Sequence, residues 1–152
     1  MQTESLINHL REKIQKDLSP LVSSDYVYLD LPYHPNIGDT LIWEGTREFL
    51  KTLPYKCLYY ASKGSFRYRQ LPKNVVILLH GGGNFGDLYR LHSEFRKKII
   101  ELYPENRIII LPQTVFYEDM SLLRYDVDFY AAHPNVMICA REQFSFDFLT
   151  VH

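Results

Sequence analysis

The stretch Val75-Val-Ile-Leu-Leu-His80-Gly-Gly-Gly-Asn-Phe-Gly-Asp87 decides the fold. Its first half is apolar without alternation, which is typical of a strand that flanking helices bury on both faces. Its second half contains three consecutive glycines and a fourth at Gly86. We expect residues 81–87 to form a loop, followed by a helix that Asp87 caps. An apolar strand, a glycine-rich loop and a helix in this order indicate an α/β sheet.

The same alternation of strands and helices continues on both sides of this stretch. Strands are expected at residues 25–31, 56–61, 75–80, 107–111 and 136–140. Helices are expected at residues 5–18, after residue 39, from about 88 to 102, from about 120 to 132, and after residue 142. The sequence thus predicts five strands in an open, mainly parallel sheet with helices on both faces. Residues 1–24 form an N-terminal helix and lead-in, and residues 25–152 form one domain.

The composition is that of an ordinary soluble domain. The 152 residues are 46% hydrophobic and 23% charged with a net charge of -1, a balance that does not favour a nucleic-acid partner. The polar start lacks the apolar core of a signal peptide, and no apolar run reaches the length of a membrane span. Cys57 and Cys139 are far apart in apolar runs, so we expect no zinc site and no disulfide framework. We therefore expect a cytoplasmic protein without a bound metal or cofactor.

The glycines lie where ligands of such sheets bind. Ligands sit beyond the carboxyl ends of parallel strands where the strand order reverses, so we expect the strands ending at Leu31 and His80 to be neighbours there. Gly81, Gly82 and Gly83 before a helix start would suit a phosphate or a carboxylate, and a tight turn with close packing is the alternative reading. The spacing also satisfies GxGxxG, but it follows the third strand, and the strand ending at Leu111 has no acidic residue at its tip. We therefore do not predict NAD binding.

A second candidate loop is Asn36-Ile-Gly-Asp39, which also follows a strand and precedes a helix. Asp39 is either the N-cap of that helix or a carboxylate at the cleft. Asp39 and Asp87 could share a magnesium ion, but two separate caps are the favoured account.

Polar residues lie at or just after the carboxyl ends of the strands expected at residues 75–80, 107–111 and 136–140. His80 could donate a proton or simply fill space with a satisfied ring. Gln113 and Thr114 could hydrogen-bond a sugar hydroxyl or a phosphate, or cap the next turn. Arg141 could hold an anion through its bidentate guanidinium, or pair with Glu142 at the surface.

Four segments in this order resemble the polysaccharide pyruvyltransferase family. They are Pro35-Asn-Ile-Gly-Asp-Thr-Leu-Ile42, His80-Gly-Gly-Gly-Asn-Phe-Gly-Asp-Leu-Tyr89, Ile109-Ile-Leu-Pro-Gln-Thr-Val115 and Arg141-Glu-Gln-Phe-Ser145. The resemblance implies one Rossmann-like half of a two-domain enzyme of the GT-B type. The missing C-terminal domain would carry a histidine motif that handles phosphoenolpyruvate, so we expect this chain alone to fold but not to transfer pyruvate.

The resemblance also implies roles for the candidate residues. An acceptor-side half-site would have a floor made of Asn36, Gly38, Asp39, Gly81, Gly82, Gly83 and Asn84, with Gln113 and Thr114 beside it. Arg141 would reach the donor, phosphoenolpyruvate, and His80 and Asp39 are the acid-base candidates. The acceptor would be a sugar or a lipid-linked glycan, which would bring the protein to the inner face of the membrane. A glycosyltransferase domain that uses a nucleotide sugar and a noncatalytic anion- or glycan-binding module are the alternatives.

Overall fold

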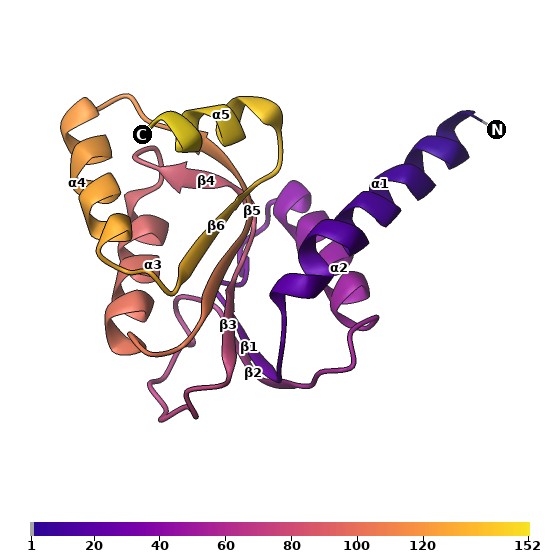
Figure 1. The fold of residues 1–152 in the computed structure, drawn as a ribbon, viewed down its shortest axis with the longest axis horizontal. Coiled ribbons are helices and arrows are strands. Elements are labelled where there is room, and N and C mark those ends of the chain that lie inside the picture. Colours follow the sequence, from indigo (N-terminus) through magenta and orange to yellow (C-terminus); the bar gives the residue numbers. More distant parts are fainter. Residues whose placement is uncertain (1) are drawn as a thin grey trace.

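The computed structural model describes residues 2–152, which form one sheet with helices on both sides (Figure 1). In chain order the elements are α1 (Gln2–Leu18), the 3-10 turn η1 (Ser19–Leu21), β1 (Tyr26–Leu29), α2 (Ile37–Leu50), β2 (Cys57–Ala61), β3 (Val76–Leu79), β4 (Gly82–Gly86), α3 (Arg90–Leu102), β5 (Ile108–Phe116), α4 (Met120–Ala131), β6 (Val136–Ala140) and α5 (Gln143–Val151). The predicted α/β architecture is confirmed.

Every strand pair in the described sheet is parallel. β1 lies between β2 and β3, and β3 pairs with the first half of β5. β4 continues along the same edge of β5, while β6 pairs with the opposite edge. The expected neighbourhood of β1 and β3 is confirmed, and the expected count of five strands is wrong because the sheet has six.

The sixth strand is the glycine segment itself. Residues 81–87 were expected to be a loop, but β4 pairs with the second half of β5, which extends to Phe116 instead of ending at Leu111. At the end of β4, Gly86 has φ +123°, and a Cβ there would collide with the carbonyl oxygen of Phe116. Glycine is therefore required for the close approach of these two strands. A loop was also expected directly after Leu111. That expectation is wrong, because β5 continues to Phe116 and pairs there with β4.

Two apolar layers sandwich the sheet. On one face, side chains of the central strands pack against α3, α4 and α5, and Ile99 of α3 is completely buried. On the other face, Tyr28, Leu78 and Leu111 pack against residues of α2 such as Leu50. Helices on both faces explain why the central strands show no alternation of apolar and polar residues.

The predicted N-terminal helix is confirmed as α1, which extends away from the sheet (Figure 1). Its apolar residues Leu6, Leu10 and Ile14 remain about half exposed.

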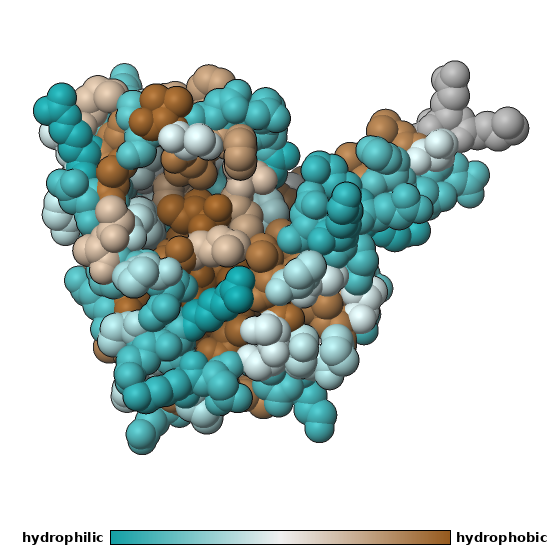
Figure 2. Space-filling view, viewed as in Figure 1, coloured by the Kyte–Doolittle hydropathy of each residue, from teal (hydrophilic) through white to brown (hydrophobic). Residues whose placement is uncertain are grey.

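On the opposite side of the molecule, Figure 2 shows apolar side chains around a hollow near α4 and α5. This hollow has a volume of about 200 Å³ and is bordered by Phe85, Tyr130 and other residues of that apolar layer.

Candidate functional site

The carboxyl ends of β1 and β3 meet at the point where the strand order reverses. Leu29 pairs with Leu79, and the His80 amide donates to the Leu29 carbonyl oxygen at 3.0 Å. Asp30 and His80 therefore follow the two strands side by side. This is the edge at which doubly wound sheets bind their ligands.

The helix α2 brings Asp39 to this edge. The Asn36 side chain is its N-cap, since Oδ1 accepts from the Gly38 and Asp39 amides at 2.9 and 3.4 Å. The expectation that Asp39 could cap the helix is therefore wrong, because α2 begins at Ile37 and Asp39 already lies within its first turn. The Asp39 carboxylate instead lies 3.5 Å from His34 Nε2 and 3.4 Å from the place a Cβ would occupy on Gly82.

Gly83, the next residue of β4, lies beside the opposite charge. Arg141 Nη2 is 3.7 Å from the place a Cβ would occupy on Gly83. Arg141 Nε donates to Thr114 Oγ1 at 2.6 Å and is 3.3 Å from a Glu142 oxygen. A carboxylate and a cation thus lie beside two successive glycines of β4, at the place where its pairing with β5 is irregular.

His80 lies inside the protein at this edge. Its Nδ1 is 2.5 Å from the Tyr28 hydroxyl, and its Nε2 has no partner among the described residues. Burial lowers the pKa of His80 to about 4, an effect only partly opposed by Asp30 and Asp39. The ring is therefore neutral at pH 7.

Gln113 is also buried, within β5 and not in the expected loop. Its Nε2 donates to the His80 carbonyl oxygen at 2.7 Å, while its Oε1 has no partner among the described residues. His80 and Gln113 thus each present a buried polar atom that a ligand group or a water molecule could satisfy.

Sequence reasoning missed a buried network behind the candidate site. Asp30, with φ +63°, directs its carboxylate to His92 Nδ1 at 2.8 Å and to Arg96 Nη2 at 3.1 Å. Arg96 also binds the side chain and the carbonyl oxygen of Asn84, so Asn84 is held by the protein. The signal was the spacing of His92 and Arg96, which puts both on one face of α3.

Asp87 does not cap a helix, contrary to expectation. Its carboxylate accepts from the Glu118 and Asp119 amides at 2.7 and 2.6 Å, and α3 begins only at Arg90, without a side-chain cap. The glycines therefore do not sit at a helix start, and the helix dipole gives no support to an anion site at Gly81–Asn84.

Two further features of the described residues bear on ligands and on membranes. The described part of the chain contains no group of three or more His, Cys, Asp or Glu residues arranged to hold a metal ion. None of the helices described here has the length and apolarity needed to cross a membrane.

The fold is a doubly wound α/β domain, and its candidate ligand edge combines two carboxylates, histidines, a glycine strand and an arginine. Residues 36–151 match the polysaccharide pyruvyl transferase family, and the chain belongs to this family.

Individual relatives agree with this assignment. A putative pyruvyl transferase of Bacillus subtilis, EpsO, is 36% identical over 81% of the chain and 38% of its own length. Pyruvyl transferase 1 of Schizosaccharomyces pombe is 30% identical over 79% of the chain and 32% of its own length. The chain thus spans about two fifths or less of these relatives.

A crystal structure of a Klebsiella pneumoniae protein of uncharacterised function has the same fold. It superimposes with a TM-score of 0.62 over 93% of the chain and 49% of that protein, at 23% sequence identity.

Proposed function

We propose that this chain is the acceptor-side half of an enzyme that transfers a pyruvyl group from phosphoenolpyruvate to a sugar of a polysaccharide. Membership of the family supports pyruvyl transfer. The observation that carries the assignment is the placement of Asp39 and Arg141 beside successive glycines of β4, Gly82 and Gly83. A carboxylate suits sugar hydroxyls that must lose protons, and a guanidinium suits a donor with a phosphate and a carboxylate.

The reaction requires a proton to be added to the donor and protons to be removed from the sugar hydroxyls. A proton is added to the methylene carbon of the enol, and a sugar hydroxyl attacks the neighbouring carbon and loses its proton to a base. A second hydroxyl of the same sugar then attacks that carbon and also loses its proton to a base, and the bond between the carbon and the phosphate oxygen breaks as inorganic phosphate leaves. The product is a cyclic ketal, and the enzyme must supply an acid, a base and a cation for the phosphate.

Two histidine-carboxylate pairs are the proposed proton carriers. His92 is fixed through Nδ1 by buried Asp30 and is 20% exposed, so Nε2 is the nitrogen left to accept a hydroxyl proton. His34 and Asp39 form the second pair, at the cleft floor. His80 was a candidate proton donor, but its low pKa leaves no imidazolium at pH 7, so we assign it a neutral hydrogen-bonding role.

Arg141 is the proposed contact to the donor. Thr114 and Glu142 engage its Nε, while no partner among the described residues engages Nη1 or Nη2. These two nitrogens can therefore bind a phosphate or a carboxylate as a fork. A single arginine is a weak site for phosphoenolpyruvate. We therefore propose that a further domain supplies the remaining contacts to the donor.

The experiment compares the 152-residue chain with a protein extended through the following domain. Phosphate release from phosphoenolpyruvate is measured with a glycan acceptor, and a nucleotide sugar replaces phosphoenolpyruvate in a parallel assay. We expect turnover only by the extended protein and only with phosphoenolpyruvate. Equal turnover by the short chain would refute the half-site, and consumption of the nucleotide sugar would identify a glycosyltransferase.

The roles of the two pairs are tested in the extended protein. His92→Gln should lower kcat about 10²-fold or more, as expected for loss of a general base. It should also remove one limb of the pH-rate profile. His133→Gln is the matched control, because His133 lies after α4 and its ring Nδ1 contacts the carbonyl oxygen of Phe129, away from the candidate site. An unchanged pH profile in His92→Gln would leave His92 with no role in proton transfer.

A further inference from the structure

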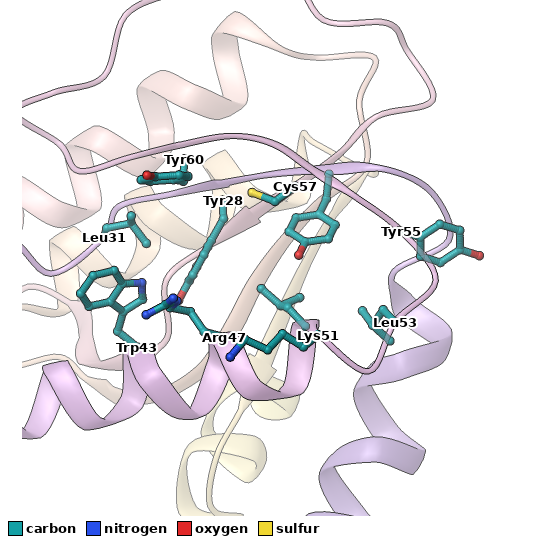
Figure 3. Close-up of a pocket in the computed structure, with 11 residues that line it drawn as sticks. Tyr28, Leu31, Trp43, Arg47, Lys51, Leu53, Tyr55, Cys57 and Tyr60 are labelled. Atoms are coloured by element: carbon teal, nitrogen blue, oxygen red, sulfur yellow. The ribbon is translucent and has the colours of Figure 1, made fainter.

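A second cavity, separate from the cleft floor, lies between α2 and the strands β1 and β2 (Figure 3). Its volume of about 560 Å³ lies within the range of small-molecule sites. The residues that line it are mainly aromatic and basic: Tyr26, Tyr28, Leu31, Trp43, Arg47, Leu50, Lys51, Leu53, Tyr55, Cys57 and Tyr60.

Aromatic rings form one end of this pocket. Figure 3 shows Trp43 and Tyr60 near Leu31, with the Tyr28 ring beside them. Tyr60 is 69% exposed on the edge strand β2, so a large ring stands at the mouth of the pocket without being packed into the core. Rings of this kind offer flat apolar surface together with a polar tip, which suits a ligand with both apolar and hydroxyl faces.

The basic residues of the pocket are balanced by acids. Arg47 Nη1 is 2.8 Å from Glu44, and Lys51 Nζ is 2.5 Å from Glu48. The local net charge is therefore close to zero. The side chains of Arg47, Lys51 and the lining tyrosines still offer polar groups for hydrogen bonds. Such a mixture favours an uncharged polyhydroxyl ligand over a phosphate, which would need unpaired cations.

The pocket lies next to the candidate site along α2. Asp39, Trp43 and Arg47 follow one another at intervals of four residues, so they lie on one face of α2, about 6 Å apart along the helix axis. Tyr28 links the two places, because it lines the pocket and its hydroxyl contacts His80. A chain-like ligand with one unit at Asp39 would place its next units along this face.

We propose that the pocket holds an uncharged sugar residue of the acceptor glycan, adjacent to the sugar that receives the pyruvyl group. This inference rests on the proposed function for the identity of the ligand. Trp43 and Tyr60 stack on the ring faces, and Arg47 hydrogen-bonds the hydroxyls. A nucleotide base and a second copy of the chain are the competing occupants.

The binding test uses the 152-residue chain and neutral oligosaccharides: lactose, cellotriose and mannotriose. Trp43 is the only tryptophan, so its fluorescence reports binding directly. We expect a saturable change with at least one sugar, and affinities about tenfold weaker in Tyr60→Ala and Arg47→Ala. Tyr125→Ala is the matched control, because Tyr125 is similarly exposed but lies on α4, across the sheet; it should bind as the wild type does.

Three results would overturn the pocket assignment. They are no response to any of the sugars, equal affinity in Tyr60→Ala, and tighter binding of uridine 5′-monophosphate than of the oligosaccharides. Sedimentation at several protein concentrations tests the remaining competitor. Self-association that Tyr60→Ala abolishes would assign the pocket to a second copy of the chain.

A second assay separates this inference from the proposed function. In the extended protein, Tyr60→Ala should raise the KM for an oligosaccharide acceptor about tenfold and leave kcat unchanged, with no effect on a monosaccharide acceptor. Unchanged KM in an active enzyme would refute the pocket alone. Oligosaccharide binding without any pyruvyl transfer would refute the proposed function and leave the pocket standing.

Discussion

Asp30 and Arg96 form an ion pair inside the protein, with Oδ2 3.1 Å from Nη2 and neither side chain more than 1% exposed. The contact is electrostatic, since Asp30 Oδ2 lacks an aligned hydrogen bond. Because Arg96 also holds Asn84, this one pair connects the end of β1, the helix α3 and the glycine strand. The pair therefore holds these three elements together behind the candidate site.

Removing one partner of this pair should be costly. Arg96→Met removes the guanidinium from the buried Asp30 carboxylate and leaves it with the His92 contact, so we expect the free energy of unfolding to fall by about 3–5 kcal/mol. Urea denaturation measures the loss. The double variant Asp30→Asn with Arg96→Met should recover part of it, since no charge remains. Lys13→Met, which breaks an exposed pair with Asp17, is the control and should leave the midpoint unchanged. A loss no larger than that of Lys13→Met would contradict the prediction.

Stability should fall at acidic pH because of His80. Its ring is neutral in both the folded and the unfolded chain above pH 6.5. Between pH 6.5 and about 4 only the unfolded chain takes up the proton, because burial lowers the folded pKa to about 4. The free energy of unfolding then falls by about 1.4 kcal/mol per pH unit. His80→Gln should lose about 2 kcal/mol less than the wild type between pH 7 and pH 5. Parallel curves for the two proteins would show that His80 titrates normally.

Two glycines should respond to alanine in opposite ways. Gly86→Ala places a methyl group against the Phe116 carbonyl oxygen at a φ of +123°, so β4 must leave β5 and we expect a loss of more than about 3 kcal/mol. Gly45→Ala lies in α2, where nothing is within 4 Å of the new methyl group, and should stabilise by about 0.5–1 kcal/mol. Thermal melting of both variants provides the measurement. A stable Gly86→Ala protein would mean that the two strands are not this close.

Inorganic phosphate should report the cation that lies beside β4. Titration should shift the amide signals of Gly83 and Thr114, which flank Arg141, while those of Gly45 stay in place. Arg141→Lys should weaken binding and Arg141→Ala should abolish it, because only the guanidinium offers a planar fork. The same shifts in Arg141→Ala would indicate a backbone anion site of the glycines, as the sequence alone suggested.

The sequence predicted those parts of the fold that depend on local pattern. The apolar run before His80 and the helical periodicity of residues 88–102 identify a buried strand and a helix without further information. The glycine strand was missed because glycine has a low strand propensity, and its pairing is decided by the distant second half of β5. Pro112 concealed that second half, since proline usually ends a strand.

The candidate site was predicted in part. Asp39, Gly82, Gly83 and Arg141 lie along one edge because the carboxyl ends of parallel strands meet there. Asp30 escaped notice, because it lay inside the strand expected at residues 25–31, where a single polar residue is ordinary. Its left-handed backbone conformation and its contact with α3 depend on packing, which no local pattern records.

The pairing of the glycine segment with β5 makes its residue count critical. A loop can gain a residue and bulge outward, whereas a paired strand that gains one reverses the face of every residue that follows. A single insertion after Gly81 would therefore move Gly82 from its place beside Asp39 and Gly83 from its place beside Arg141, and both close approaches would be lost. Length in this segment is thus as strictly constrained as residue identity, and natural variation in loop length should be confined to other connections, such as residues 62–74.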